Sequence, residues 1–262
     1  MFDWLKRRSD GGELPAYSEV WERPTRGLPP DLEKLEAGEE YRARHSAIEQ
    51  DLRSTPLRPM DDAVMFIALI GADRKGVVTI PAPDGGPACI PIFSSPIRVA
   101  DYVRMLLSHG TRLNFLTLSP AGLVDMLTDL RRAGVGTLTM DRCPRCNCFA
   151  TLGSESAKTP DDVINIWSIF KAGELARLEL YLSYARESAR AGRLDLARQV
   201  ALETAAHVSL EDPRVHQMLG RIAVAQKDRK LFDEAKRFLR YRKLEAAERE
   251  LDEAMRSGSP GF

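Results

Sequence analysis

The 262-residue chain lacks an apolar run long enough to cross a bilayer, because the longest, residues 63–72, is far shorter than the ~20 residues that a membrane helix needs. No apolar signal segment follows the charged N-terminus. Basic residues show no excess, since 38 lysines and arginines balance 38 aspartates and glutamates. A basic excess is typical of nucleic-acid-binding proteins. We therefore expect a cytoplasmic protein with no transmembrane segment and no specific nucleic-acid partner.

Familiar catalytic motifs are also missing from the sequence. It contains no G-x-S-x-G, H-E-x-x-H, Walker-type or dinucleotide-binding fingerprint. The paired carboxylates Asp61–Asp62 and Asp161–Asp162 stand at the starts of predicted elements, where acidic side chains favour a helix dipole or flank a strand. The composition, 44% hydrophobic and 29% charged, is that of a globular protein with one or two domains. The sequence predicts an interaction protein rather than an enzyme, with no catalytic residues.

The first part of the chain, residues 1–60, is rich in proline and charge and predicts an arm rather than a packed domain. One helix is expected within it, over residues 31–51, where a thin apolar stripe runs among charged side chains. At its start, Met1, Phe2, Trp4 and Leu5 precede three basic residues. This segment is either a frayed terminus or a shallow anchor for a membrane or a protein groove.

The second part, residues 61–153, predicts an α+β domain in the order βββαβαβ. Ser95-Pro96 and Ser119-Pro120 each provide a helix N-cap followed by proline at the first helical position. Gly110 and Gly134 end the two helices. The predicted strands are Val64–Ile70, Val77–Ile80, Ile90–Phe93, Leu113–Leu118 and Val135–Met140.

Four short segments of this region carry a family resemblance. They are Phe66–Leu69, Ile80-Pro81, Ile90–Ser95 leading into a helix, and Leu116–Gly122. Together they resemble the SseB-type N-terminal domain, from a family named for an enhancer of type III secretion. Ser119-Pro120 stands where that family usually has Asn-Pro. The resemblance implies a small α+β domain of bacterial origin without a catalytic residue set.

The third part, residues 159–257, predicts an all-α, helical-repeat-like domain beyond a polar boundary near residues 153–158. Tyr184-Ala185 and Leu219-Gly220 lie 35 positions apart, close to the 34-residue spacing of tetratricopeptide repeats, which this region resembles. The second repeat fits if about three residues are inserted before Ala235, and residues 244–255 provide a capping helix. We expect the helix containing Trp167 to belong to this array, since two repeats need further support.

Three of the four cysteines lie within six positions of one another. The C-P-x-C turn formed by Cys143 and Cys146 is typical of a zinc knuckle, and Cys148 adds a third thiolate. Cys89 is the first candidate for a fourth ligand and His109 the second. The alternatives are reduced thiols without metal, and redox chemistry, for which the helix that normally follows such a motif is missing. The predicted cofactor is therefore none, or zinc.

Basic residues gather between Arg221 and Lys243, nine of them against three acidic ones. This region is either a solvated helical face or a docking surface for an acidic partner segment. The predicted partner-binding residues are Arg221, Lys227, Arg229 and Lys230.

Our preferred hypothesis is a non-enzymatic adaptor, scaffold or chaperone that binds a protein partner, with a link to secretion implied by the resemblance. The alternatives are a zinc-stabilised or redox-sensitive regulatory protein built on the cysteine cluster, and an unrecognised enzyme.

Overall fold

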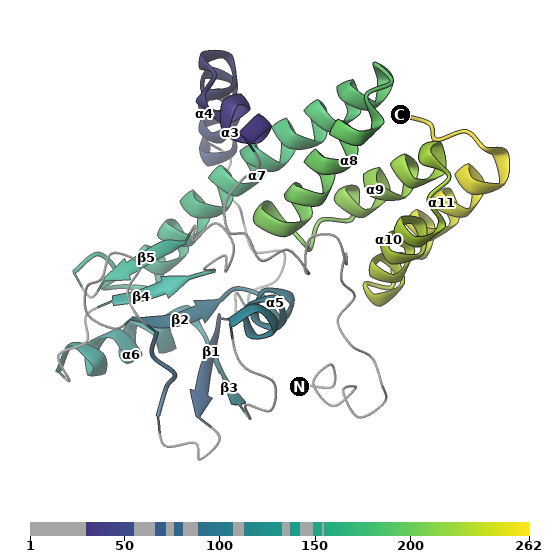
Figure 1. Ribbon diagram of the computed structural model, residues 1–262. Coiled ribbons are helices and arrows are strands. Elements are labelled where there is room, and N and C mark those ends of the chain that lie inside the picture. Colours follow the sequence, from purple (N-terminus) through teal and green to yellow (C-terminus); the bar gives the residue numbers. More distant parts are fainter. Residues whose placement is uncertain are drawn as a thin grey trace. The chain divides into compact units, whose positions relative to one another are not determined.

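A computed structural model of the chain describes residues 30–54, 66–71, 76–80, 89–106, 113–132, 137–141, 149–153 and 155–262 (Figure 1). The protein is a mixed α/β structure with a five-stranded sheet in its N-terminal half and mostly helices in its C-terminal half. Its described residues form two compact units, of which the first ends at Leu180 and the second begins at Tyr181. None of the described helices is both long enough and apolar enough to span a membrane.

The first unit is built on a sheet with the strand order β3-β1-β2-β4-β5. Strand β1 pairs antiparallel with β2 and β3, β4 pairs antiparallel with β5, and the central pair β2 and β4 is parallel. Because β2 and β4 are parallel, the residues that follow them, Ser94 and Asp141, come out at the same edge of the sheet. The strands are β1 (Phe66–Gly71), β2 (Ile90–Phe93), β3 (Leu113–Leu118), β4 (Thr137–Met140) and β5 (Ala150–Gly153).

Alternating side chains of β1 enter two separate apolar clusters. Phe66 and Ala68 belong to the cluster that also contains apolar residues of helix α6 (Pro120–Arg132) and of helix α7 (Pro160–Arg190). Ile67 and Leu69 belong to the cluster that contains Val99 and Tyr102 of helix α5 (Pro96–Leu106). Both faces of the sheet are therefore covered by helices, which explains why strands β1 and β2 are almost continuously apolar.

Two details of the predicted strand order differ from the structure. Residues 77–80 form only isolated bridges, Val77 with Ile70 and Ile80 with Cys89. Strand β5, in contrast, was not expected, because Ala150 and Leu152 are its only buried side chains and two apolar positions give too short a pattern to predict a strand.

The expected helix of the arm is present as two helices, α3 (Pro30–Ala37) and α4 (Glu39–Ser54), separated at Gly38. Leu32 is fully buried. The arm is fixed to α7 by polar contacts: Arg177 donates to Glu36 at 2.6 Å, and a ring nitrogen of His45 lies 3.2 Å from the carbonyl oxygen of Gly173. The apolar segment at residues 1–5 lies outside the described residues.

The boundary between the two units lies further along the chain than the sequence suggested. Val163, Ile166, Trp167 and Phe170 pack in the same cluster as the sheet, so this half of α7 belongs to the α+β unit and not to the helical array. The polar stretch near residue 154 separates β5 from α7 within one unit.

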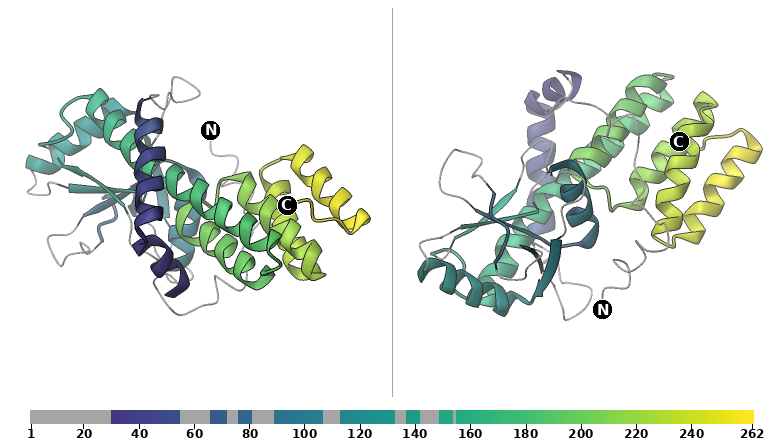
Figure 2. Two further views of the ribbon diagram at one scale, coloured as in Figure 1. Left: turned by 90° about the horizontal axis from the view of Figure 1, so that it is seen from above. Right: turned by 60° about the horizontal axis from the view of Figure 1, so that its bottom comes forward.

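The second unit consists of the last turns of α7 followed by helices that form successive hairpins (Figure 2). Gly192 and Lys227, both in the left-handed conformation (φ 75° and 56°), end the first helices of two hairpins and lie 35 positions apart. The second helices start at the same spacing, Leu194 and Arg229, so the insertion expected before Ala235 does not occur. The further elements are α8 (Leu194–Glu203), a π-helical turn (Thr204–Val208), α9 (Pro213–Gln226), α10 (Arg229–Tyr241) and α11 (Glu245–Ser257).

Candidate functional site

The predicted metal ligands are only partly covered by the structure. Cys143, Cys146, Cys148 and the alternative ligand His109 lie outside the described residues. Cys89 is 2% exposed, and its Sγ lies 3.8 Å from Oγ1 of Thr139 on the neighbouring strand β4. Among the residues that the structure describes, no group of three histidine, cysteine or carboxylate side chains could hold a metal ion. Zinc binding by the cysteine cluster stays a prediction.

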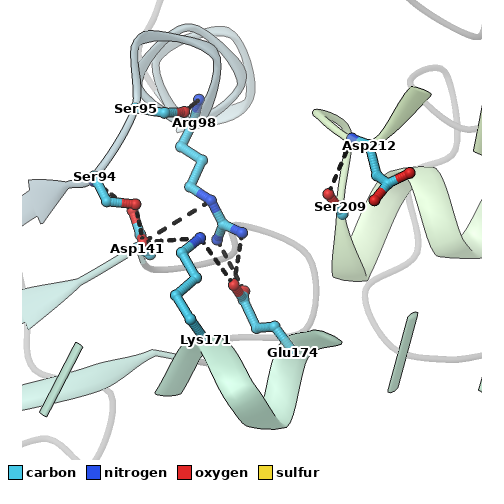
Figure 3. Close-up of polar contacts among 8 residues, drawn as sticks. All are labelled: Ser94, Ser95, Arg98, Asp141, Lys171, Glu174, Ser209 and Asp212. Atoms are coloured by element: carbon cyan, nitrogen blue, oxygen red, sulfur yellow. Dashed lines mark hydrogen bonds and ion pairs between the residues drawn. The ribbon is translucent and has the colours of Figure 1, made fainter. Parts of the chain in front are cut away.

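A group of charged side chains in the first unit surrounds Asp141 (Figure 3). Asp141 follows β4, and Ser94 follows the parallel strand β2 at the same edge of the sheet. Ser94 donates two hydrogen bonds to the carboxylate, from its backbone N–H at 2.7 Å and from its hydroxyl at 2.5 Å. Arg98 of α5 and Lys171 of α7 approach the same carboxylate at 3.9 and 3.5 Å.

Glu174 completes this group from α7. It accepts two hydrogen bonds from Arg98, at 2.9 and 2.7 Å, and one from Lys171 at 3.1 Å. Two carboxylates thus face two cations, and each cation contacts both carboxylates.

The environment of Asp141 keeps it ionised. Burial opposes ionisation of this side chain, which is 0% exposed, but the charges of Arg98 and Lys171 and the two hydrogen bonds from Ser94 outweigh burial and hold its pKa below the ordinary value. A carboxylate that is enclosed and saturated by donors in this way ties α5 and α7 to the edge of the sheet. We therefore assign this group to the stability of the unit.

In the second unit, helix α9, which opens the second hairpin, presents a polar stripe. On α9, Val215, Leu219 and Ile222 are fully buried, whereas Arg214, Gln217 and Arg221 lie at helical spacing on the side that retains exposure. Helices α9 and α11 approach closely beside this stripe, because Gly220 of α9 faces the fully buried Leu251 of α11. Gln217 donates to Glu250 of α11 at 3.1 Å, which joins the exposed sides of the two helices.

A short segment without regular secondary structure, residues 259–262, lies against these helices (Figures 1 and 2). Gly258, in the left-handed conformation (φ 67°), ends α11 and lets the chain change direction. Arg221 of α9 donates a hydrogen bond to the carbonyl oxygen of Gly261. Arg190, the last residue of α7, donates two to the main-chain oxygen of Phe262, at 3.3 and 3.1 Å. Two arginines from successive first helices therefore hold this segment by its main chain.

A cavity of about 490 Å³ opens beside the segment. Arg221 lines it from α9, Glu250 and Glu253 line it from α11, and Pro260 and Gly261 line it from the segment. The wall is thus formed partly by residues 259–262, so removal of the segment would enlarge the exposed surface. We call the surface formed by Arg190, Gln217, Arg221 and Glu250 the array face.

The four predicted partner-binding residues occupy two places. Lys227 ends α9 and Arg229 and Lys230 begin α10, so these three share one turn. Arg229 is paired with Asp233 at 3.1 Å, and its guanidinium lies 5.4 Å from the ring centre of Phe232.

Arg221, in contrast, lies on the array face, where it faces Glu250 at 3.7 Å. Sequence reasoning missed Arg190 and the 259–262 segment. Arg190 and Phe262 are 72 positions apart, and no local periodicity predicts such a contact.

Comparison with protein-family models, with curated proteins and with solved structures finds no match to this chain.

Proposed function

We propose that the protein is a non-enzymatic adaptor that holds an extended segment of a partner protein on its array face. The observation that carries this proposal is the seated 259–262 segment, which two arginines bind through main-chain oxygens. A surface that engages the main chain of an irregular segment can accept other segments of similar conformation, because those contacts do not depend on side-chain identity. The long arginine side chains supply several donors each, which suits this task.

The chemistry of the partner follows from the same contacts. Arg221 already faces Glu250, and Arg229 is paired with Asp233. Charge attraction to an acidic partner segment is therefore a weaker support for binding than the main-chain contacts, although Lys227 and Lys230 add positive charge at the neighbouring turn. The resemblance of the first unit to the SseB-type domain supports a role as a secretion-related chaperone or scaffold in the bacterial cytoplasm.

Photo-cross-linking in the full chain tests this proposal. A photoreactive phenylalanine analogue at position 217 lies on the array face, whereas the same analogue at the exposed position 237 of α10 is the matched control. After irradiation in native lysate, we expect one partner to cross-link at 217 and not at 237, and peptide mapping should place the link in a short continuous stretch of that partner. Cross-linking from 237 alone, or equally from both positions, would contradict the proposal.

A further inference from the structure

We infer that residues 259–262 are an internal occupant of the array face, and that a partner segment must displace them. This inference rests on the proposed function and adds its regulation and the chemistry of its ligand. The segment takes up the donors of Arg190 and Arg221 that a partner would use. As long as it is seated, the face is closed to an incoming chain.

The contacts that hold the segment are few enough for it to be exchanged. Ser259 and Gly261 are exposed, and Pro260 and Phe262 are only half-buried. Gly258 and Gly261 both adopt left-handed conformations (φ 67° and 60°), which glycine populates without strain and from which it can also rotate freely. The segment can therefore leave the face while α11 stays folded, since Gly258 lies beyond the last residue of that helix.

Attachment to α11 makes the segment an effective competitor despite its few contacts. A short flexible connection gives an effective concentration in the millimolar range. A free segment with the same intrinsic affinity therefore binds only to the fraction of molecules in which the face is open, and its apparent affinity falls in proportion to that fraction.

The seated residues also indicate which kind of ligand fits the array face. The main chain supplies the acceptors for both arginines, Pro260 restricts the backbone before them, and Phe262 contributes a partly buried aromatic side chain. We therefore expect the partner segment to be short and irregular in conformation, with a proline followed by a small residue and an aromatic or large apolar residue.

A fluorescence-anisotropy titration tests the inference with a defined probe. The probe is a fluorescein-labelled, C-terminally amidated peptide with the sequence of residues 257–262, so that only main-chain amides and side chains are presented. It is titrated with the full chain and with a chain that stops after Gly258, whose helical content is checked by circular dichroism. We expect at least tenfold tighter binding to the shortened chain, and at least tenfold loss when that chain also carries Arg190→Gln or Arg221→Gln.

The control variant is Arg237→Gln, an exposed arginine of α10, which should leave the affinity of the shortened chain unchanged. The variant Phe262→Lys in the full chain removes the aromatic side chain and places a positive charge beside Arg190, so it opens the face without a deletion and should raise peptide affinity severalfold. If the full and shortened chains bind the peptide equally, residues 259–262 do not block the array face. If the shortened chain does not bind the peptide, the expected chemistry of the partner segment is wrong.

The proposed function fails on a different result. If a partner cross-links at position 217 of the full and shortened chains to the same extent, the proposed adaptor function holds and only its regulation by residues 259–262 is rejected. If no partner cross-links at position 217 in either chain, the proposed adaptor function is rejected.

Discussion

Replacing Gly220 by alanine tests the close approach of α9 and α11 that builds the array face. A Cβ atom at this position would lie 2.8 Å from Cδ2 and 3.2 Å from Cγ of Leu251. Carbon atoms in contact prefer about 3.5–4.0 Å. Leu251 is fully buried, so its side chain cannot turn into solvent, and either its rotamer or the position of α11 must change.

The size of the effect follows from two opposing contributions. Overpacking a tight contact costs about 1–3 kcal/mol, whereas replacing glycine by alanine inside a helix gains about 1 kcal/mol. We expect Gly220→Ala to lower the free energy of unfolding by up to about 2 kcal/mol, measured by urea denaturation followed by circular dichroism. The matched control is Gly173→Ala in α7, where the nearest atom, Oε1 of Glu49, would be at an ordinary 3.6 Å. That variant should gain about 0.5–1 kcal/mol.

A double-mutant cycle isolates the contact itself. Leu251→Ala removes the atoms that a Cβ at position 220 would meet, so Gly220→Ala should cost less in that background, with a coupling energy of about 1–3 kcal/mol. If Gly220→Ala stabilises the protein as much as Gly173→Ala does, or if the coupling is zero, the two helices do not approach as described.

Two buried titratable side chains, His216 and Asp141, give further predictions. Burial lowers the pKa of His216 to about 4 despite the hydrogen bond with the Leu210 carbonyl. In the unfolded chain the pKa of this histidine is near 6.5, so between these two pH values the unfolded chain binds a proton that the folded chain does not bind. Stability should therefore fall by roughly 3 kcal/mol as pH drops from about 6.5 to 4, and His216→Leu should flatten that slope in urea titrations at each pH. Asparagine at position 141 keeps the side-chain shape and tolerates the positive φ of 52°, but it removes the negative charge that Arg98 and Lys171 face. We therefore expect Asp141→Asn to lower the free energy of unfolding by about 3–5 kcal/mol, whereas Asp129→Asn, at an exposed ion pair, should lower it by under about 1 kcal/mol. Equal losses of stability in thermal denaturation would contradict the role given to Asp141.

Local patterns in the sequence predicted much of the sheet and its helices. The strand Leu113–Leu118 and the helix starts at Pro96 and Pro120 were placed correctly, because an N-cap serine followed by proline is a strong local signal. Residues 77–80 failed as a strand although they are β-branched, since their pairing is limited to single bridges with Ile70 and Cys89.

Tertiary contacts decided the points that local patterns could not. The apolar face around Trp167 is equally compatible with a helical array and with a sheet, and only its packing shows that it covers the sheet. Asp141 gave no signal at all, because its importance depends on Ser94 and Arg98 in one distant segment of the chain and on Lys171 in another. Arg190 was missed for the same reason, since its acceptor lies 72 positions away.

The proposed use of the array face requires that residues 259–262 lie against it, and an intramolecular cross-link measures their position. A photoreactive phenylalanine analogue replaces Phe262 with little change in shape, and the irradiated full chain is digested and analysed by mass spectrometry. We predict that the main intramolecular product joins position 262 to the last turn of α7, next to Arg190. Products that join position 262 only to residues outside α7, α9 and α11, or only to other molecules, would contradict the seated segment and with it the proposed use of the array face.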